Sequence, residues 1–234
     1  MHDLTAILTS RGAALVGFAD MGAVPAELRG GLPRAVSIAA ALDPAVVAGI
    51  AGGPTREYVA HYSMRNALLD ELAAETERFL RSGGARAERF AATNLGTAVR
   101  LPHKTAATRA GLGWIGKCAL LVTERYGPAV RLATVLTDAE LPVGAPVDES
   151  RCGECQECRK ICPGGAVRGP NWRLGMEREE IFSEPACREG IRKVGAGLER
   201  LVCGMCIAAC PWTRGYLRRA LGSGQPQMNT DAHG

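Results

Sequence analysis

The spacing of apolar residues along the first part of the chain changes between the period of a helix and the length of a buried strand. Leu4, Ile7 and Leu8 fit one face of a short helix, and the segment Leu15–Phe18 that follows predicts a strand. The apolar run Ala35–Leu42 has the length of a second, buried strand. This part of the chain therefore predicts alternating α and β elements.

A long amphipathic helix is predicted from Thr55 to Arg81, and Ser82–Gly84 is expected to end it. Its apolar residues recur at helical spacing: Tyr58, Tyr62, Leu68, Leu69, Leu72, Ala73, Phe79 and Leu80. Beyond this helix, Ala85–Ala92 predicts a strand, and Thr105–Ala110 predicts a second helix that stops at glycines.

Two further apolar segments, Cys118–Thr123 and Val130–Asp138, predict paired strands joined by a turn at Tyr126–Pro128. The stretch Leu141–Ser150 contains two prolines and little periodicity, so we place a domain boundary there. The expected parts are an α/β domain over residues 1–145, a cysteine-rich domain over residues 146–220 and a disordered polar tail over residues 221–234.

The composition excludes several classes of protein. Hydrophobic residues make up 47% of the 234-residue chain and charged residues 22%, which is typical of a folded globular protein. No stretch of eighteen uncharged apolar residues occurs and the N-terminus has no signal-peptide pattern, so we expect a cytoplasmic protein with no membrane partner. A net charge of +4 and 5% aromatic residues do not indicate a nucleic-acid surface. Arg214, Arg218 and Arg219 fit a solvated helix face better than the alternative, a binding patch.

Cysteine is concentrated in one segment. Eight of the nine cysteines lie between Cys152 and Cys210, and only Cys118 lies outside. The stretch CGECQECRKICP (Cys152–Pro163) matches C-x2-C-x2-C-x3-C-P, the pattern with which bacterial two-cluster ferredoxins bind 4Fe-4S clusters. Disulfides are disfavoured because a chain without a secretion signal is expected in a reducing compartment. Zinc is the alternative, since C-x2-C pairs also build tetrahedral sites.

A second motif, CGMCIAACP (Cys203–Pro211), repeats this pattern without its first cysteine, and Cys187 restores the count. In the ferredoxin pattern the last cysteine of each motif binds the other cluster. The first cluster then takes Cys152, Cys155, Cys158 and Cys210, and the second takes Cys162, Cys187, Cys203 and Cys206. Two adjacent clusters form a relay for single electrons, whereas one zinc site needs only four ligands.

Three glycines, Gly111, Gly113 and Gly116, mark a tight turn between the second predicted helix and the strand that follows. Either a ligand or backbone approaches closely there, or the helix simply stops before a strand with Trp114 and Ile115 in the core. A dinucleotide-binding loop is disfavoured, because the glycines follow a helix and precede a strand, the reverse of the Rossmann order.

Three stretches together resemble the epoxyqueuosine reductase family and, more distantly, the catalytic domain of reductive dehalogenases. They are AGLGWIGK (Ala110–Lys117), ALLVTERYGPAVRLATVLTD (Ala119–Asp138) and the eight-cysteine segment. The resemblance implies an α+β protein in which a nitroreductase-like α/β domain that binds cobalamin precedes a ferredoxin-like domain with two 4Fe-4S clusters. It also implies that electrons pass through the clusters to cobalt, which then carries out the reduction.

The resemblance further implies site residues. A corrinoid pocket would be lined by Gly111, Gly113, Trp114, Gly116, Lys117, Tyr126 and Gly127. The family's acidic proton donor corresponds to Thr97 here, so we take His103 and Lys104, close to the glycine turn, as catalytic candidates. Cys118 occupies a position that is often polar in the family, and we interpret it as a buried thiol, with cobalt or substrate chemistry as the alternative.

Two functions stay open at the level of sequence. The first is a cobalamin-dependent, two-cluster reductase of a small or nucleoside-like substrate, supplied by a low-potential electron donor such as ferredoxin or flavodoxin. The second is an electron-transfer or corrinoid-reducing protein that docks a partner protein and has no substrate of its own. Transfer RNA is disfavoured as a partner, because the sequence shows no counterpart of the C-terminal helical repeat domain that many family members use with it.

Overall fold

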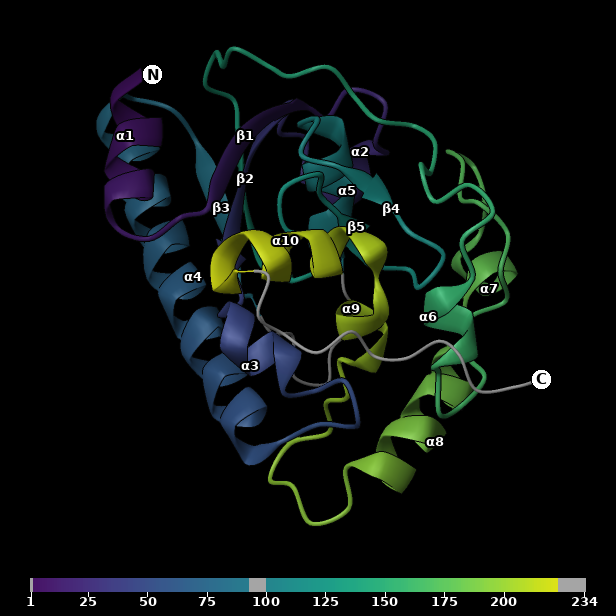
Figure 1. Cartoon of the computed structure of the whole chain (residues 1–234). Helices are drawn as coiled ribbons and strands as arrows, with labels where there is room; N and C mark the ends of the chain where they lie inside the picture. Colours follow the sequence, from purple (N-terminus) through teal and green to yellow (C-terminus); the bar gives the residue numbers. More distant parts are fainter. Residues whose placement is uncertain (1, 93–99, 223–234) are drawn as a thin grey trace, which may run out of the picture.

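The computed structural model describes residues 2–92 and 100–222, and its largest sheet has four antiparallel strands (Figure 1). The strands lie in the order β1 (Leu15–Asp20), β2 (Arg34–Ala41), β6 (Val130–Thr137) and β3 (Ala87–Phe90). In the register of the sheet, Ile38 of β2 lies between Val16 of β1 and Ala133 of β6. The four segments predicted as strands at these positions are confirmed.

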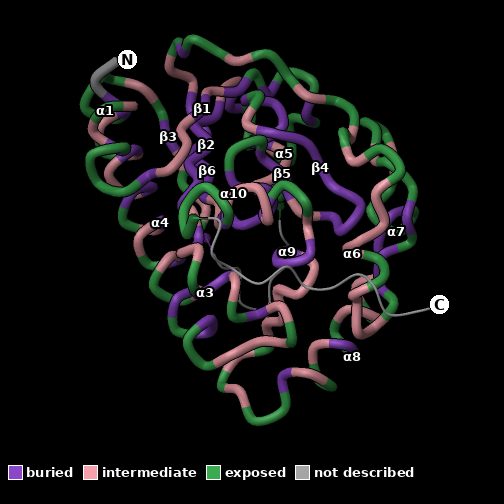
Figure 2. Tube along the Cα trace, viewed as in Figure 1, coloured by how far each residue is buried: buried purple, intermediate pink, exposed green. Residues whose placement is uncertain are grey.

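Alternate residues of the central strands face opposite layers of helices, as the two-residue period of a strand requires. The layers are formed by α1 (His2–Ser10) and α4 (Arg56–Ser82) on one face and by α5 (His103–Arg109) on the other. Val36 and Ile38 pack toward α1 and α4, whereas Ala35 packs toward α5. Figure 2 shows the central strands as buried along most of their length.

The long predicted helix is confirmed as α4, and its ends follow from its sequence. The Thr55 hydroxyl accepts a hydrogen bond from the Tyr58 backbone amide at 3.1 Å, which caps the N-terminus. At the other end, the Gly83 amide donates to carbonyl groups of the last turn. One face of this helix covers the sheet, and the Tyr58 end reaches toward the cysteine segment.

One predicted strand pairing is wrong. β5 (Leu121–Val122) pairs with β4 (Trp114–Ile115) in a separate two-stranded sheet and not with β6. Both edges of β6 are occupied, by β2 and β3, so its backbone groups are already paired. Thr123 and Gly127 exchange backbone hydrogen bonds of 3.0 and 2.9 Å, which reverses the chain before β6 begins.

The remaining helices are short and lie mostly in the cysteine-rich part of the chain. They are α2 (Ala26–Arg29), α3 (Pro44–Ala48), α6 (Glu157–Lys160), α7 (Arg178–Ile181), α8 (Glu184–Val194), α9 (Met205–Ala209) and α10 (Pro211–Leu221). α9 and α10 return to the first part of the chain, where Ile207 and Leu217 share a core with Val47 and Tyr58. A hydrophobic core therefore crosses the boundary predicted near residue 145, and the division into separate domains stays a prediction.

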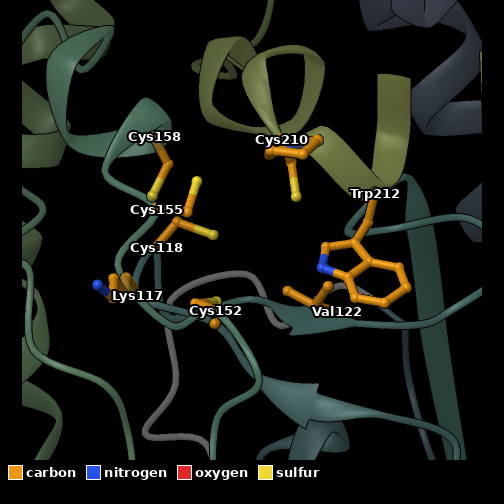
Figure 3. Close-up of a pocket in the computed structure, with 10 residues that line it drawn as sticks. Lys117, Cys118, Val122, Cys152, Cys155, Cys158, Cys210 and Trp212 are labelled. Carbon is orange, nitrogen blue, oxygen red and sulfur yellow. The ribbon is translucent and has the colours of Figure 1, made fainter. Parts of the chain in front are cut away.

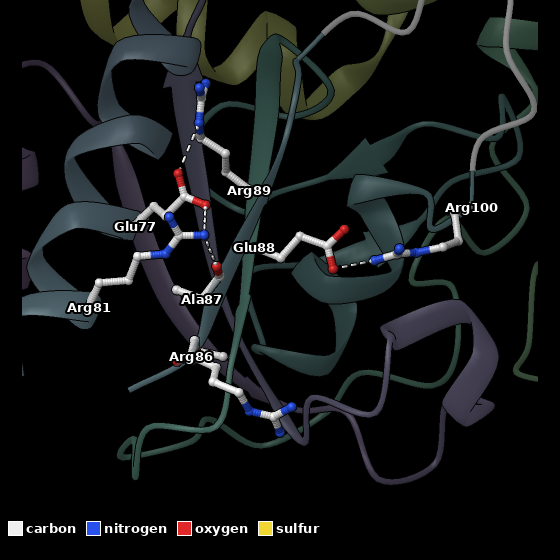
Figure 4. A network of polar contacts seen from close by, with 8 residues as sticks. Glu77, Arg81, Arg86, Ala87, Glu88, Arg89 and Arg100 are labelled. Carbon is white, nitrogen blue, oxygen red and sulfur yellow. Dashed lines mark hydrogen bonds and ion pairs between the residues drawn. The ribbon is translucent and has the colours of Figure 1, made fainter. Parts of the chain in front are cut away.

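The edge strand β3 is flanked by a network of ion pairs (Figure 4). Glu77 of α4 pairs with Arg81 at 2.9 Å and with Arg89 of β3 at 3.1 Å. Glu88 of β3 pairs with Arg100 at 2.6 Å. Exposed pairs of this kind contribute about 0–1 kcal/mol each, so the network adds little to the stability of the fold.

Two sequence predictions fall outside the described residues: the role of Thr97 and the disorder of the tail after residue 222. Within residues 2–92 and 100–222, no helix has the length and apolar character needed to cross a membrane.

Candidate functional site

Four cysteines from two distant segments surround one cavity. Cys152, Cys155 and Cys158 line it from the first motif, and Cys210 lines it from the start of α10 (Figure 3). The cavity has a volume of about 340 Å³. Burial, with a further contribution from the Cys152 and Cys158 thiols, raises the pKa of Cys210 to about 11. These four residues are the set predicted for the first cluster.

The other four cysteines of the segment form a second group. Burial raises the pKa of both Cys187 and Cys203, and the Cys162 thiol raises both further, which places it beside them. Cys206 packs against an apolar cluster that also contacts Cys162 and Cys187, together with Cys158 of the first group. Cys162 thus joins the thiols of the second motif, just as Cys210 joins those of the first. This arrangement supports the predicted crossed ligand sets.

The spacing of the thiols suits multi-atom clusters better than single ions. A tetrahedral zinc site holds each sulfur about 2.3 Å from one ion. In the part of the chain that the structure describes, no three His, Cys, Asp or Glu side chains come close enough together to hold such an ion. The first four thiols instead stand around a cavity with room for the iron and sulfide atoms of a cubane.

A backbone amide donates to one sulfur of the second group, and the N-terminus of α10 lies beside one sulfur of the first. Burial raises the Cys210 pKa, and the Thr213 and Trp212 amides there lower it by less. The Ala166 amide donates to the Cys162 sulfur at 3.2 Å. Hydrogen bonds to ligand sulfurs stabilise the extra negative charge of a reduced cluster, so they raise its reduction potential.

The glycines predicted to line a corrinoid pocket face the protein's own backbone. A β-carbon at Gly113 would overlap the Val122 carbonyl oxygen, and one at Gly127 would overlap the Thr213 amide. Gly111 lies in the same way against the loop at residue 145. Close approach of one backbone segment to another therefore accounts for these glycines without a ligand.

The other predicted lining residues lie beside the first cluster and α10. Gly116 and Lys117 line the cavity of the first four cysteines, and the Lys117 amino group donates to a backbone carbonyl at 2.7 Å. Trp114 is fully buried and packs edge-on against Trp212, with ring centroids 5.1 Å apart. Tyr126 is buried against Tyr216 of α10. The corrinoid role of these residues stays a prediction.

The space near the glycine loop is small for a corrinoid. Gly111, Gly113 and Trp114 line a cavity of about 240 Å³. Sites for drug-sized ligands measure about 300–1,000 Å³, and cobalamin is larger than such ligands. This cavity by itself is too small for a corrin macrocycle, and the role of these three residues in binding one stays a prediction.

The two catalytic candidates are neighbours on α5 but have different surroundings. His103 has its Nδ1 3.0 Å from the Thr134 hydroxyl and its Nε2 2.9 Å from the Ala91 carbonyl oxygen, and burial lowers its pKa. The Lys104 amino group donates to the Ala119 carbonyl at 2.7 Å. Burial lowers the Lys104 pKa to about 8, and the positive charge of Arg178 contributes to the shift. Their catalytic roles stay predictions.

The sequence did not predict a polar group beside the second set of thiols. Tyr58, Tyr62 and Asn66 lie one turn apart on α4, and Arg131 of β6 stacks over Tyr62 with its Cζ 4.1 Å from the ring centroid. Arg131 also donates to the Asn66 side-chain oxygen at 2.9 Å. Burial raises the Tyr58 pKa, and two thiols of the second group raise it further, which places this group next to them. The sequence feature that could have indicated this polar group is Arg131, a charged residue inside the otherwise apolar strand β6.

Comparison with known proteins agrees with this geometry. Residues 151–213 match the family described as the 4Fe-4S double cluster binding domain. The chain is 31% identical over 206 residues to an epoxyqueuosine reductase of Salmonella typhimurium, covering 83% of this chain and 51% of the relative. It is 28% identical over 213 residues to that of Pseudomonas aeruginosa, covering 88% and 58%. The predicted resemblance is confirmed, and the chain spans little more than half the length of these relatives.

Solved structures agree on the fold. A catabolic reductive dehalogenase, NpRdhA, in complex with 3-bromo-4-hydroxybenzoic acid matches with a TM-score of 0.71 at 20% identity, covering 93% of this chain and 33% of that one. An epoxyqueuosine reductase with an epoxyqueuosine-modified tRNA stem loop matches with a TM-score of 0.64 at 20% identity, covering 92% and 65%. At this level of identity the likeness establishes the α+β fold and not the substrate.

Proposed function

We propose that this chain is an iron–sulfur reductase that takes electrons from a low-potential donor, passes them through two 4Fe-4S clusters to cobalamin, and so reduces a small or nucleoside-like substrate. The observation that carries the proposal is the crossed grouping of the thiols, in which Cys210 and Cys162 each join the opposite motif. Crossed ligation places two clusters next to each other, which is what a relay requires. The likeness to epoxyqueuosine reductases supports the class of reaction.

We propose that the corrinoid lies against the polar group beside the second cluster. Tyr62 lies under two guanidinium groups, those of Arg131 at 4.1 Å and Arg200 at 5.3 Å from the ring centroid. Guanidinium N–H groups and an aromatic face suit the amide-rich edge of a corrinoid. When bound, cobalamin supplies a cobalt centre that accepts electrons and delivers them to the substrate.

Lys104 is better suited than His103 to supply a proton. A pKa of about 8 keeps the Lys104 ammonium mostly protonated at neutral pH and still able to release a proton. The lowered pKa of His103 keeps the imidazole neutral, and both ring nitrogens are engaged. His103 then acts as a positioning residue, because it joins Thr134 of β6 to the chain that follows β3.

Corrinoid retention tests the proposal. The full chain, purified anaerobically with reconstituted clusters, is incubated with hydroxocobalamin, desalted and measured by visible absorption and iron analysis. We expect about eight iron atoms per chain and stoichiometric corrin bands that change on reduction. Arg131→Gln should keep the iron and lose most of the corrin, whereas the exposed Arg125→Gln should keep both.

The outcomes separate the two functions. Iron–sulfur absorption without retained corrin would overturn the cobalamin proposal and favour an electron-transfer protein that docks a partner. Retained corrin justifies a substrate search. It would begin with epoxyqueuosine as a free nucleoside and in the tRNA stem loop found with one similar structure, and turnover of the free nucleoside is the expected result.

A further inference from the structure

Helix α10 presents basic and aromatic side chains to solvent beside the first group of thiols. Arg218 and Arg219 are exposed in its last turn, and Trp212 near its start is 37% exposed. The helix contains no acidic residue. The sequence alone favours a solvated helix face here, and the surroundings of the helix in the folded chain favour a binding patch instead.

Arginines from two other segments extend this surface. The Arg219 guanidinium donates to the Arg125 carbonyl, which brings Arg125 next to the end of α10. At the start of the helix, Trp212 packs against Trp114, and the Arg151 Cζ lies 5.5 Å from the centroid of that second ring. Arg125 and Arg151 are both exposed and line one cavity. We define the basic patch as Arg125, Arg151, Trp212, Arg218 and Arg219.

The surface around the basic patch is more positive than the chain as a whole. Its segments carry seven basic and three acidic residues: 124–125, 151–160 and 211–221. Over the whole chain the corresponding numbers are 28 and 24. Two of the three acidic residues are paired, Glu124 with Arg151 at 2.6 Å and Glu157 with Arg214 at 3.5 Å. This surface therefore attracts an acidic partner.

The basic patch adjoins the first group of thiols. Pro211 and Trp212 directly follow the predicted ligand Cys210, are exposed, and line the cavity of that group (Figure 3). The second group is covered by the sheet region, since a β-carbon at Gly204, next to Cys203, would overlap the Tyr58 ring. The proposed corrinoid also lies on that side. Electrons from outside the protein therefore have their shortest way in at the first cluster.

We propose that the basic patch is the docking surface of the electron donor, a small acidic protein of the flavodoxin class that reduces the first cluster beside Trp212. The inference rests on the proposed function, because it takes the first cluster as the start of the relay. In each transfer the anionic flavin hydroquinone of the donor loses one electron and becomes the neutral semiquinone. The oxidised first cluster gains that electron, and no covalent bond forms or breaks.

The residue types of the basic patch suit a transient contact with a protein. Tryptophan and arginine are enriched in protein interfaces and among the residues that contribute most to binding. Charges at the rim of an interface mainly accelerate encounter with a partner of opposite charge. RNA is also acidic, but a substrate has to reach the proposed corrinoid, which lies beside the second group of thiols. The position of the basic patch therefore favours the electron donor.

Two matched double variants of the full chain test the docking surface. Arg218→Gln with Arg219→Gln removes two charges from the last turn of α10, and Arg192→Gln with Lys193→Gln removes two from the last turn of α8. Both helices have 11 residues, all four side chains are exposed, and Figure 1 shows the helices apart. After anaerobic reconstitution and iron analysis, rapid-mixing absorption follows cluster reduction by the hydroquinone of a bacterial flavodoxin. A photochemically generated deazaflavin radical, a small uncharged reductant, serves as the reference that needs no docking.

We expect the α10 variant to lower the second-order rate constant with flavodoxin about tenfold at low salt. The difference should shrink as ionic strength rises, because salt screens charges on the surface. The α8 variant should stay close to the unaltered protein, and the deazaflavin radical should reduce all three proteins at the same rate. Arg125→Gln should show a smaller decrease with flavodoxin, since it removes one charge.

Several results would overturn the docking surface. Equal slowing in the α8 and α10 variants would show that the rate follows net charge and not the basic patch. An α10 variant that flavodoxin reduces at the unaltered rate would contradict the proposal, and so would one that the deazaflavin radical also reduces slowly. A tRNA stem loop that binds the unaltered chain but not the α10 variant, with the flavodoxin rate unchanged, would assign the patch to nucleic acid. With full iron, each of these results leaves the proposed function intact, whereas an unaltered chain without two clusters would overturn both.

Discussion

The sheet region and the cysteine region of this protein are held together by different forces. In the first, apolar residues of α1, α4 and the sheet are buried against one another in a continuous core. In the second, the helices are only 4 to 11 residues long, and every residue from Arg151 to Pro163 is half-buried or exposed. Hydrophobic burial stabilises the sheet region, whereas the cysteine region has a smaller apolar core and is expected to gain further stability when its thiolates bind metal.

The two regions share a hydrophobic core, in which Ile207 and Leu217 pack with Val47 and Tyr58. Tyr216 of α10 donates to the Leu42 carbonyl at 2.9 Å, and Gly127 lies against the start of α10. These contacts join the sheet region to the part of the chain that carries the predicted cluster ligands. Substitutions on either side should therefore have different consequences.

Cys210→Ser should produce the largest effect and one confined to the cysteine region. Because Cys210 lies with the thiols of the first motif, the variant should lose the first cluster, about four of eight iron atoms. Iron analysis and electron paramagnetic resonance check this result, with Cys118→Ser as the control that retains both clusters. Loss of the second cluster alone would refute the crossed assignment.

Gly127→Ala should disrupt the contact between the regions. The residue has a φ of 57°, and a β-carbon there would overlap the Thr213 amide. We expect the free energy of unfolding to fall by about 3 kcal/mol, the sum of backbone strain and overpacking. Gly84→Ala is the matched control, since Gly84 also has a positive φ of 84° but faces open space. Equal urea midpoints for the two variants would show that the overlap is relieved without cost.

Lys104→Met should change the pH dependence of stability on the sheet side. Burial lowers the Lys104 pKa to about 8, so keeping the ammonium buried costs free energy below that pH. The unfolded chain binds more protons between about pH 8 and 10.5, so stability should rise with pH over this range. The methionine variant should lose this rise in the free energy of unfolding, which amounts to at most about 3 kcal/mol. The rise is measured from urea midpoints at pH 7.5 and pH 10. If stability changed with pH equally in the variant and the unaltered protein, the lowered Lys104 pKa would be contradicted.

His103→Ala should have the smallest effect on stability, about 1–2 kcal/mol from two lost hydrogen bonds. Both clusters should stay intact, and turnover should fall several-fold because the chain next to β3 is no longer tied to β6. His103→Gln can keep one of the two hydrogen bonds, so its stability and turnover should lie between those of the unaltered protein and of His103→Ala. An unchanged rate in the alanine variant would remove His103 from the site.

Local patterns predicted much of this fold and misplaced one part of it. Helix α4 and the strands of the main sheet follow from apolar periodicity, because burial of one face dictates that pattern. The pairing of β5 was predicted wrongly, since an apolar segment does not record which sheet edge is free. The glycines near Trp114 indicated a close approach, but only the folded chain shows that the approaching atoms are its own backbone.

By itself, the sequence determined the chemistry of the metal centre. The number and spacing of the cysteines limit what they can bind, because thiolate count and pitch are properties of the chain. The tertiary structure decided which residues surround that centre. It packed Cys118 in one apolar cluster with cysteines of both groups and set Arg131 beside Tyr62. These contacts join segments far apart in sequence, which local spacing does not encode.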